Sequence, residues 1–389
     1  MKDGNGPDRP HEAGRPARGF LGPEIRALIL SAIVAAGVVS SVSMAVAQSP
    51  GTTAAASTAP PFKLSVAVGP AYPWGKGASR WAELVSERSG GRITLKVFPG
   101  ASATGGDPLQ EFVGLKQGTI DFAVGSSMYW AGYVKPLNLF ALPFLVSDPK
   151  ALDALIAGPV GATLFKAIEE AGVIPLAWGD NEQHAVSTST RTIRQPEDVR
   201  GLKLRVTGST PVEEAFRALG ATPARYRWTD AQNALLGGTI AGQETAPQSF
   251  VATKAHTLNQ KHLTLWAMAA EPLVFAASRA AWGRLDAADR ELVGQAAIDA
   301  AKTQVEASRS ATAAAIASLG REYRDAKVEI VTLSAGERAA FAAATKPVYE
   351  RWAIEIGIDL VRVAEQAVGA VNATGAAGPD GATGAAAKR

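Results

Sequence analysis

Short runs of alternating hydrophobic and polar residues, joined by segments with helical spacing, open the folded part of the chain. Three such runs predict half-buried strands, at residues 64–68, 93–97 and 120–124. Between the first two runs, Trp81, Leu84 and Val85 share one face of an expected helix. Between the second and third runs, Asp107 begins a helix and Gly118 ends it. This β-α-β-α-β order predicts an α/β fold with a largely parallel sheet covered by helices.

The same alternation returns in the second half of the chain. The stretch "GLKLRV" (201–206) predicts a half-buried strand with Lys203 and Arg205 on its polar face. Thr210 is the expected cap of the following helix, and Glu213 completes a capping box. An α/β pattern that starts again after about residue 185 indicates two lobes.

A long helix and a short internal similarity support this two-lobe organisation. Residues 286–319 are Ala-rich and helical almost without a break, which corresponds to on the order of 50 Å at 1.5 Å per residue. A helix of that length can run across both lobes. "LKQGTIDFA" (115–123) is similar to "LLGGTIAGQ" (235–243), because each is a helix end followed by Gly and by Thr-Ile entering a strand.

The two ends of the chain differ in composition from the rest. Residues 27–47 are apolar, follow a polar leader with four Arg, and end in the small-x-small pattern Ala45-Val46-Ala47. We therefore expect a signal peptide, residues 1–47, that is cleaved after Ala47, and the alternative is a retained membrane anchor. Residues 48–61 are predicted to be a low-complexity spacer and residues 373–389 a disordered tail.

Composition and motifs exclude several classes of site. Net charge is +3, and no Lys/Arg-rich block is present, so no nucleic-acid partner is expected. The chain has no Cys, and its four His show no metal-ligand spacing, so neither a metal nor another cofactor is expected. No HExxH, GxSxG, Walker A or GxGxxG motif occurs, which argues against an enzyme without removing that alternative.

Several stretches together resemble one family. "PEDVRGLKLRV" (196–206) is similar to the signature of solute receptors of tripartite ATP-independent periplasmic (TRAP) transporters, of the DctP type. Further matching stretches follow in the same order along the chain: "GGRITLKVFPG" (90–100), "LKQGTIDFAVGS" (115–126), "NLFALPFLVSDP" (138–149), "FRALGATP" (216–223), "ALLGGTIAGQET" (234–245) and "EPLVFAASRAAWGRL" (271–285). The resemblance covers nearly all of residues 62–372.

The resemblance implies a two-lobed periplasmic-binding-protein (flytrap) fold with a long helix spanning both lobes. The expected bounds are 62–184 plus about 275–310 for lobe I, and 185–274 plus about 311–372 for lobe II. It further implies a periplasmic, non-enzymatic receptor. Such a receptor binds an organic anion between its lobes and delivers it to the small and large membrane subunits of a transporter driven by an ion gradient.

Arg205 is the residue that the resemblance places at the family's carboxylate clamp. A guanidinium is a permanently charged planar fork that can hold a carboxylate with two hydrogen bonds. Arg205 lies late in its strand, where ligands of open α/β sheets gather, and Ser209 lies in the loop before a helix N-terminus. The alternative is a solvated Arg on a strand face. Lys203 is expected to be a surface or interlobe residue.

Other family contact positions fall on residues whose roles are less specific. Trp228 matches a pocket aromatic, with core packing as the alternative, and Thr245 falls where the family usually has Asn. Gln243 and Glu244 are either contact or structural residues. The remaining candidates are Ser126 and Tyr129 at contact positions and Asp107 near one, although a helix-cap role also explains Asp107.

The family's second basic residue has no exact equivalent here. Strict spacing gives Ala185, and a one-residue slip gives His184. If His184 serves, the second anchor is weaker and depends on pH; if Ala185 is the equivalent, the ligand is expected to carry one carboxylate. The nearby aromatic residues are compatible with an apolar or aromatic acid: Trp74, Tyr129, Trp130, Trp228 and Trp266.

Two other functions remain open on the sequence. One is a receptor of the same fold that serves a sensor kinase. The other is a secreted α/β hydrolytic enzyme, whose catalytic triad would be set by geometry rather than by a local motif.

Overall fold

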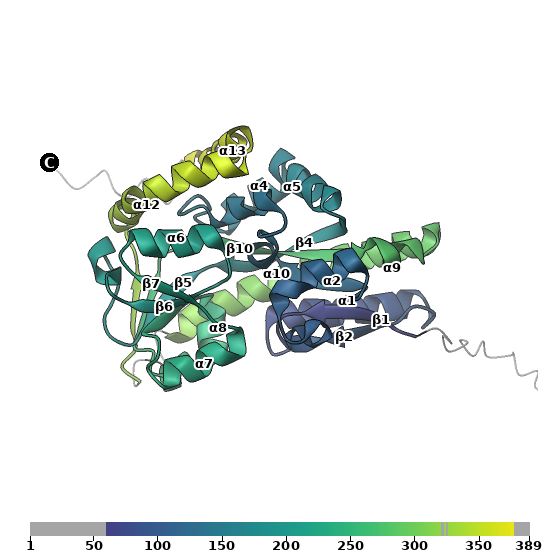
Figure 1. Cartoon of the computed structure of the whole chain (residues 1–389), viewed down its shortest axis with the longest axis horizontal. Coiled ribbons are helices and arrows are strands. Elements are labelled where there is room, and N and C mark those ends of the chain that lie inside the picture. Colours follow the sequence, from purple (N-terminus) through teal and green to yellow (C-terminus); the bar gives the residue numbers. More distant parts are fainter. Residues whose placement is uncertain (1–59, 320–322, 324–325, 377–389) are drawn as a thin grey trace, which may run out of the picture. The chain divides into compact units, whose positions relative to one another are not determined.

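The computed structural model describes residues 60–319, 323 and 326–376 (Figure 1). The predicted signal peptide lies outside the described residues, as do most of the predicted spacer and tail. β1 begins at Phe62, directly after the predicted spacer. The last helix, α13 (Ile358–Ala376), continues past residue 373, so the first residues of the predicted tail are helical.

The first sheet carries the predicted βαβ pattern and belongs to lobe I. Its strands lie in the order β2 (Leu95–Phe98), β1 (Phe62–Val66), β3 (Phe122–Ser126), β10 (Ala270–Ser278), β4 (Val173–Gln183). β1, β2 and β3 are parallel, as predicted, but β10 runs antiparallel to both β3 and β4. The sheet is therefore mixed, because β4 leaves lobe I and β10 returns to it.

The second sheet belongs to lobe II and repeats this mixture. Its strands lie in the order β11 (Glu329–Thr332), β9 (His262–Leu265), β5 (Ala185–Thr188), β8 (Gly242–Thr245), β6 (Lys203–Val206), β7 (Thr222–Arg225). β6 is parallel to β7 and β8, whereas β5 is antiparallel to β8 and β9.

Helices cover both sheets and supply most of the remaining core. In the first half of the chain they are α1 (Pro73–Arg88), α2 (Glu111–Gln117), α3 (Ser127–Trp130), α4 (Pro149–Ala157) and α5 (Pro159–Glu170). The second half holds α6 (Thr210–Ala218), α7 (Trp228–Leu236), α8 (Pro247–Ala252), α9 (Arg279–Gly283), α10 (Ala287–Leu319) and α12 (Ala335–Ile356). No described helix is by itself long and apolar enough to cross a membrane; the bent pair α4 and α5 passes that test only jointly, on length and composition.

Two crossings of the chain between the sheets lie side by side. β4 passes into β5 through His184, and β9 passes into β10 through residues 266–269. The His184 backbone N–H donates to the Ala269 carbonyl at 2.9 Å, and Ala270 pairs with Gln183, so the two connections are joined. Such a pair of strand connections is suited to act as a hinge between lobes.

The predicted long helix is present as α10 and contacts both lobes (Figure 1). Near its middle, the Gln304 side chain exchanges two hydrogen bonds with the backbone of Asp180 on β4. Ser308, one turn further, accepts a hydrogen bond from Gln248 of α8 at 3.1 Å. On α1, Gly77 allows the close approach of α10, since a Cβ at this position would lie 2.6 Å from Gln304 Cγ.

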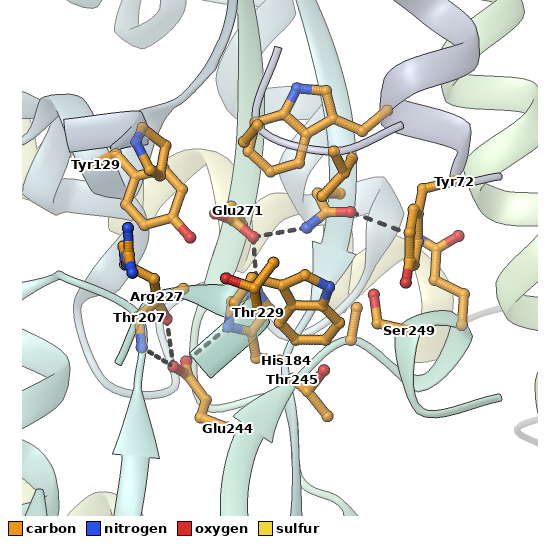
Figure 2. A pocket seen from close by; sticks show the side chains of 18 of the residues that line it. Tyr72, Tyr129, His184, Thr207, Arg227, Thr229, Glu244, Thr245, Ser249 and Glu271 are labelled. Atoms are coloured by element: carbon orange, nitrogen blue, oxygen red, sulfur yellow. Dashed lines mark hydrogen bonds and ion pairs between the residues drawn. The ribbon is translucent and has the colours of Figure 1, made fainter. Parts of the chain in front are cut away.

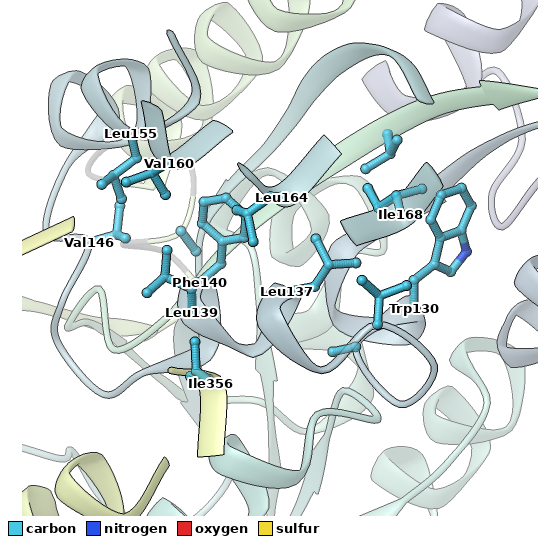
Figure 3. Close-up of a cluster of buried hydrophobic side chains, with 14 of the residues drawn as sticks. Trp130, Leu137, Leu139, Phe140, Val146, Leu155, Val160, Leu164, Ile168 and Ile356 are labelled. Carbon is cyan, nitrogen blue, oxygen red and sulfur yellow. The ribbon is translucent and has the colours of Figure 1, made fainter. Parts of the chain in front are cut away.

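The C-terminal helix packs on lobe I, a feature that the sequence does not predict. Val361, Ala364 and Val368 of α13 join the buried cluster of α4 and α5. Figure 3 shows this cluster, with Ile356 at the end of α12 beside it. Residues up to 372 were expected in lobe II, yet this helix contributes to the other lobe's core because α12 brings the chain back. The exact bounds of the two lobes stay a prediction.

Candidate functional site

A cavity of about 240 Å³ is lined by residues of both lobes near the two chain crossings (Figure 2). Lobe I contributes residues from the start of α1, from α3 and from β4 and β10; lobe II contributes β6, α7, β8 and α8. This volume is much larger than the space that one water needs. The cavity can therefore take a small organic molecule.

Arg205 is the central cation of this cavity. On β6 the exposed Lys203 faces solvent, as expected, whereas Arg205 is only 3% exposed. Its guanidinium donates to the backbone carbonyls of Tyr226 (3.4 Å) and Glu244 (3.3 Å). No carboxylate in the described part of the chain forms an ion pair with it. Burying a charge without a counterion costs free energy, so the site is prepared for an anion from outside the chain.

Aromatic rings surround this guanidinium. The Trp228 ring lies 5.4 Å from Arg205 Cζ, in a cation–π arrangement, and contacts Tyr72 of lobe I edge-on. Tyr129 stacks on Trp74, whose indole N–H donates to the Val124 carbonyl at 2.7 Å. Burial raises the pKa of Tyr129 to about 12 although Arg205 opposes this, so the phenol remains a neutral group at the cavity wall.

The cavity floor is a buried ion cluster that we call the His184 floor, made of His184, Glu244 and Glu271. His184 Nδ1 lies 2.6 Å from Glu244 Oε1, and Nε2 lies 2.9 Å from Glu271 Oε2. Each of the three side chains is at most 3% exposed. Glu244 comes from lobe II, Glu271 from lobe I and His184 from the crossing between them, so the cluster joins the two lobes (Figure 2).

The protonation of the floor follows from these contacts. Burial alone would lower the pKa of His184, but the two carboxylates outweigh burial and raise it to about 10. Burial would likewise raise the pKa of Glu244 and Glu271, yet the imidazolium and further hydrogen bonds hold both below their ordinary value. At neutral pH the floor therefore contains one cation and two anions.

Neutral polar groups complete the hydrogen bonds of the floor. Glu244 Oε2 accepts hydrogen bonds from the backbone N–H and the hydroxyl of Thr207. Glu271 accepts from the Ser126 hydroxyl and from Asn181 Nδ2. Because Asn181 turns its nitrogen to a carboxylate, its oxygen is the acceptor for Gln248 Nε2 at 3.3 Å. The orientation of both amides is thus fixed.

The predicted site residues divide into two groups. Those that line the cavity are Arg205, Trp228, Thr245, Tyr129 and His184. Four others do not: Ser126, Ser209, Gln243 and Asp107. Ser126 instead supports Glu271, and the Asp107 side chain caps a short helix by accepting from Leu109 N at 3.0 Å, the alternative role considered for it.

Ser209 has a role that the sequence assigned to its neighbour. It is the N-cap residue of α6, one position before the predicted cap Thr210, and its side chain makes no capping hydrogen bond. The predicted capping box is wrong, because Glu213 forms ion pairs with Arg217 and Arg225 instead. In α7, Trp228 is the first helical residue and Arg227 is the N-cap.

Sequence reasoning did not select several residues that line the cavity. These are chiefly Tyr72, Asn181, Thr207, Arg227 and Glu271. A usable signal existed for Glu271, because it is the second residue of the fully buried strand β10 and the strand's one charged residue. A charged residue in such a strand needs a partner, and this points to a buried cation elsewhere in the fold.

An α/β chain of two sheets, with a cavity lined by both lobes and a hinge of paired connections, has the architecture of extracytoplasmic solute-binding proteins. Residues 64–355 match the model of the DctP family, "Bacterial extracellular solute-binding protein, family 7". The chain belongs to this family of bacterial extracellular solute-binding proteins. The predicted class and the two-lobed fold are confirmed.

Individual relatives agree with this assignment. The crystal structure of a TRAP periplasmic solute-binding protein from Ralstonia eutropha H16, with bound (S)-2-acetolactate, is 46% identical and has a TM-score of 0.76; the match covers 79% of this chain and 98% of that one. The C4-dicarboxylate-binding periplasmic protein DctP of Rhodobacter capsulatus is 26% identical over 79% of this chain and 90% of that protein. An uncharacterized Sinorhizobium fredii protein is 31% identical over 76% of this chain but only 53% of its own length.

Proposed function

We propose that this protein is the extracytoplasmic receptor of a TRAP-type transporter, which captures an organic acid in the cavity and delivers it to the small and large membrane subunits. Its family and the organic acid bound to the Ralstonia eutropha relative support the substrate class. We further propose that the chain is exported and that residues 1–47 are removed during export, as their apolar segment and small-x-small end suggest.

The observation that carries the proposal is the buried, unpaired guanidinium of Arg205. A ligand carboxylate in the cavity would supply its missing counterion through a bidentate pair, while Trp228 covers one face of the guanidinium. A charge-assisted pair is stronger inside a closed cavity than in water, because the local dielectric is lower. Arg205 is thus proposed as the clamp that the resemblance implies.

Ligand binding in this cavity would favour the closed state. Tyr129 and Tyr72 come from lobe I, and Arg205 and Trp228 from lobe II, so a ligand between them gains contacts only when both lobes are near. Differential contact of this kind shifts a hinge equilibrium toward closure. We propose that the membrane subunits recognise this closed form.

Titration calorimetry on the purified receptor tests the proposal after a thermal-shift screen of organic acids and neutral sugars. A stabilising acid should bind Arg205→Ala at least about 30-fold more weakly, the equivalent of about 2 kcal/mol. Lys203→Ala is the matched control, since it removes an exposed cation from the same strand and should bind like the wild type. Undiminished binding by Arg205→Ala, or a clear preference for neutral sugars, would overturn the proposal.

A further inference from the structure

The charges that line the cavity limit which groups a ligand can carry at the end away from Arg205. This inference rests on the proposed function. In the described part of the chain, five ionisable residues other than tyrosine line it: Arg205, Arg227, His184, Glu244 and Glu271. If Arg205 holds one carboxylate, a second one needs another cation that has donors to spare. The contacts of His184 and Arg227 decide whether such a cation exists.

His184 has no donor left for a ligand. Each of its ring nitrogens already faces a carboxylate, Glu244 at 2.6 Å and Glu271 at 2.9 Å. An imidazolium has only two N–H groups, so both are used within the protein. The sequence-based hypothesis that His184 serves as a second anchor therefore finds no support in the geometry.

Arg227 uses one of its five N–H donors in an ion pair, and its side chain lies in contact with solvent. Its Nε donates to Asp230 at 2.7 Å, and its side chain is 57% exposed. A pair at such a site is screened by water and contributes little affinity. Arg227 can therefore attract an anion but is a poor clamp compared with Arg205, which is 3% exposed.

The floor carries net negative charge. Two carboxylates and one imidazolium give a charge of −1, held by side chains that are at most 3% exposed. A ligand carboxylate placed against this floor would meet like charge at low dielectric, which weakens its binding. The floor thus disfavours a second anionic group on the ligand.

Uncharged polar groups are instead available along the lobe II wall. Thr229, Thr245 and Ser249 line the cavity (Figure 2). The Thr245 hydroxyl has no hydrogen-bond partner among the described residues, although its residue is only 3% exposed. Buried hydroxyls are normally paired, so this one indicates a ligand hydroxyl or carbonyl group nearby.

We propose that the receptor selects monocarboxylates whose other polar groups are neutral hydroxyl or carbonyl groups, and that the His184 floor rejects dicarboxylates. Arg205 holds the single carboxylate and the wall of Thr229, Thr245 and Ser249 contacts the rest. Glu271 and Glu244 act as specificity residues through their charge, without forming hydrogen bonds to the preferred ligand.

Matched ligand pairs test this selectivity by calorimetry at neutral pH. Succinate against succinamate and glutarate against glutaramate each compare a carboxylate with a neutral amide of the same shape; malate against 2-hydroxybutanoate compares it with a methyl group. In each pair that binds, the monocarboxylate should bind at least tenfold tighter. A dicarboxylate that binds as tightly as its partner overturns the selectivity but leaves the receptor function standing. No binding by any carboxylate, these and the screened acids included, counts against the proposed function itself.

A charge-neutral floor should weaken the discrimination. Glu271→Gln removes one floor anion at nearly constant shape, and the ratio of the two dissociation constants within a pair should fall at least threefold. Glu329→Gln is the matched control, because it makes the same change on an exposed residue of β11 outside the cavity lining. An unchanged ratio in a folded Glu271→Gln protein contradicts the role of the floor. If that variant does not fold, the wild-type pairs still decide the selectivity.

Discussion

Arg205 and His184 are both buried cations at one cavity, and the protein treats them in opposite ways. Among the described residues, Arg205 donates only to neutral groups, with carbonyl contacts at 3.3 and 3.4 Å. His184 lies between two carboxylates at 2.6 and 2.9 Å. Arg205 thus lacks a counterion, whereas His184 has two. Removal of Arg205 should therefore change ligand affinity, and removal of His184 should change the stability of the folded protein.

This difference separates binding from stability. A buried charge that waits for a ligand contributes to affinity and little to the stability of the empty protein, since its burial is a cost. A buried charge that is fully paired contributes to the folded state, because removing it leaves other charges without a partner. Burial alone, which the two cations share, therefore does not identify a ligand-binding residue. The presence or absence of a carboxylate partner within the protein does.

The largest effect is expected for the free energy of unfolding of His184→Gln. Glutamine removes the cation and leaves Glu244 and Glu271 buried without it, so the ligand-free protein should lose about 3–5 kcal/mol. Urea unfolding followed by circular dichroism measures this loss. His262→Gln is the control, because His262 pairs with the 54% exposed Glu329 and should cost less than about 1 kcal/mol. Equal losses of unfolding free energy in the two variants would show that the buried pairing of His184 does not stabilise the folded state more than an exposed pair.

The pH dependence of stability gives the next test of the floor. The folded protein keeps the proton of His184 up to a pKa of about 10, whereas the unfolded chain releases it near 6.5. Between these pH values the folded state binds more protons, so its stability falls as pH rises. The carboxylates have lowered pKa values, so their contribution is lost only as pH falls below about 4.5.

Unfolding of wild type and His184→Gln at pH 6, 8 and 10 isolates this contribution. The free-energy difference between them should be largest at pH 6 and should shrink toward pH 10. An NMR titration of the His184 ring should show no midpoint between pH 5.5 and 8.5. A midpoint near 6.5, or a difference that grows with pH, would show that the floor is not an ion cluster.

The two cations also differ in how far the sequence reveals them. Arg205 could be predicted from the sequence, because strand alternation and a recognisable local signature lie within a few residues of it. The partners of His184 lie 60 and 87 positions away, on strands from opposite lobes. No local pattern predicts such a cluster. One hypothesis from the sequence therefore made His184 a weak second anchor, whereas in the structure both of its ring nitrogens already face carboxylates.

The fold shows the same division between local and distant information. The long helix was predicted almost to the residue, because an uninterrupted Ala-rich segment is a local signal. The antiparallel return of β10 and the packing of α13 on α4 were not predicted, since both depend on which lobe the chain enters after a crossing. The α6 cap was missed by one residue, which is within the usual uncertainty of helix ends.

Trp228 should give a smaller effect than either cation. Trp228→Leu removes the ring beside Arg205 and its contact with Tyr72, so the affinity for the acid should fall about tenfold, as for a partly desolvated cation–π contact. Trp228→Phe keeps an aromatic face and should lose less. Calorimetry on both variants measures the order. If Trp228→Leu binds the acid as tightly as Trp228→Phe does, the aromatic ring contributes only its volume to binding.

Arg227 should give the smallest effect, although it lies next to Trp228 in the sequence and lines the same cavity. Its pair with Asp230 is exposed, so Arg227→Ala should change the affinity for a monocarboxylate less than about threefold. The association rate should fall more than the dissociation rate rises, because an exposed cation mainly steers the anion toward the cavity, and added salt should abolish the difference. Stopped-flow binding at low and high ionic strength separates these rates. A large, salt-independent loss of affinity would make Arg227 a second clamp. A cation that already has a carboxylate partner would then bind the ligand as Arg205 is proposed to do, and pairing would no longer distinguish ligand-binding cations from structural ones.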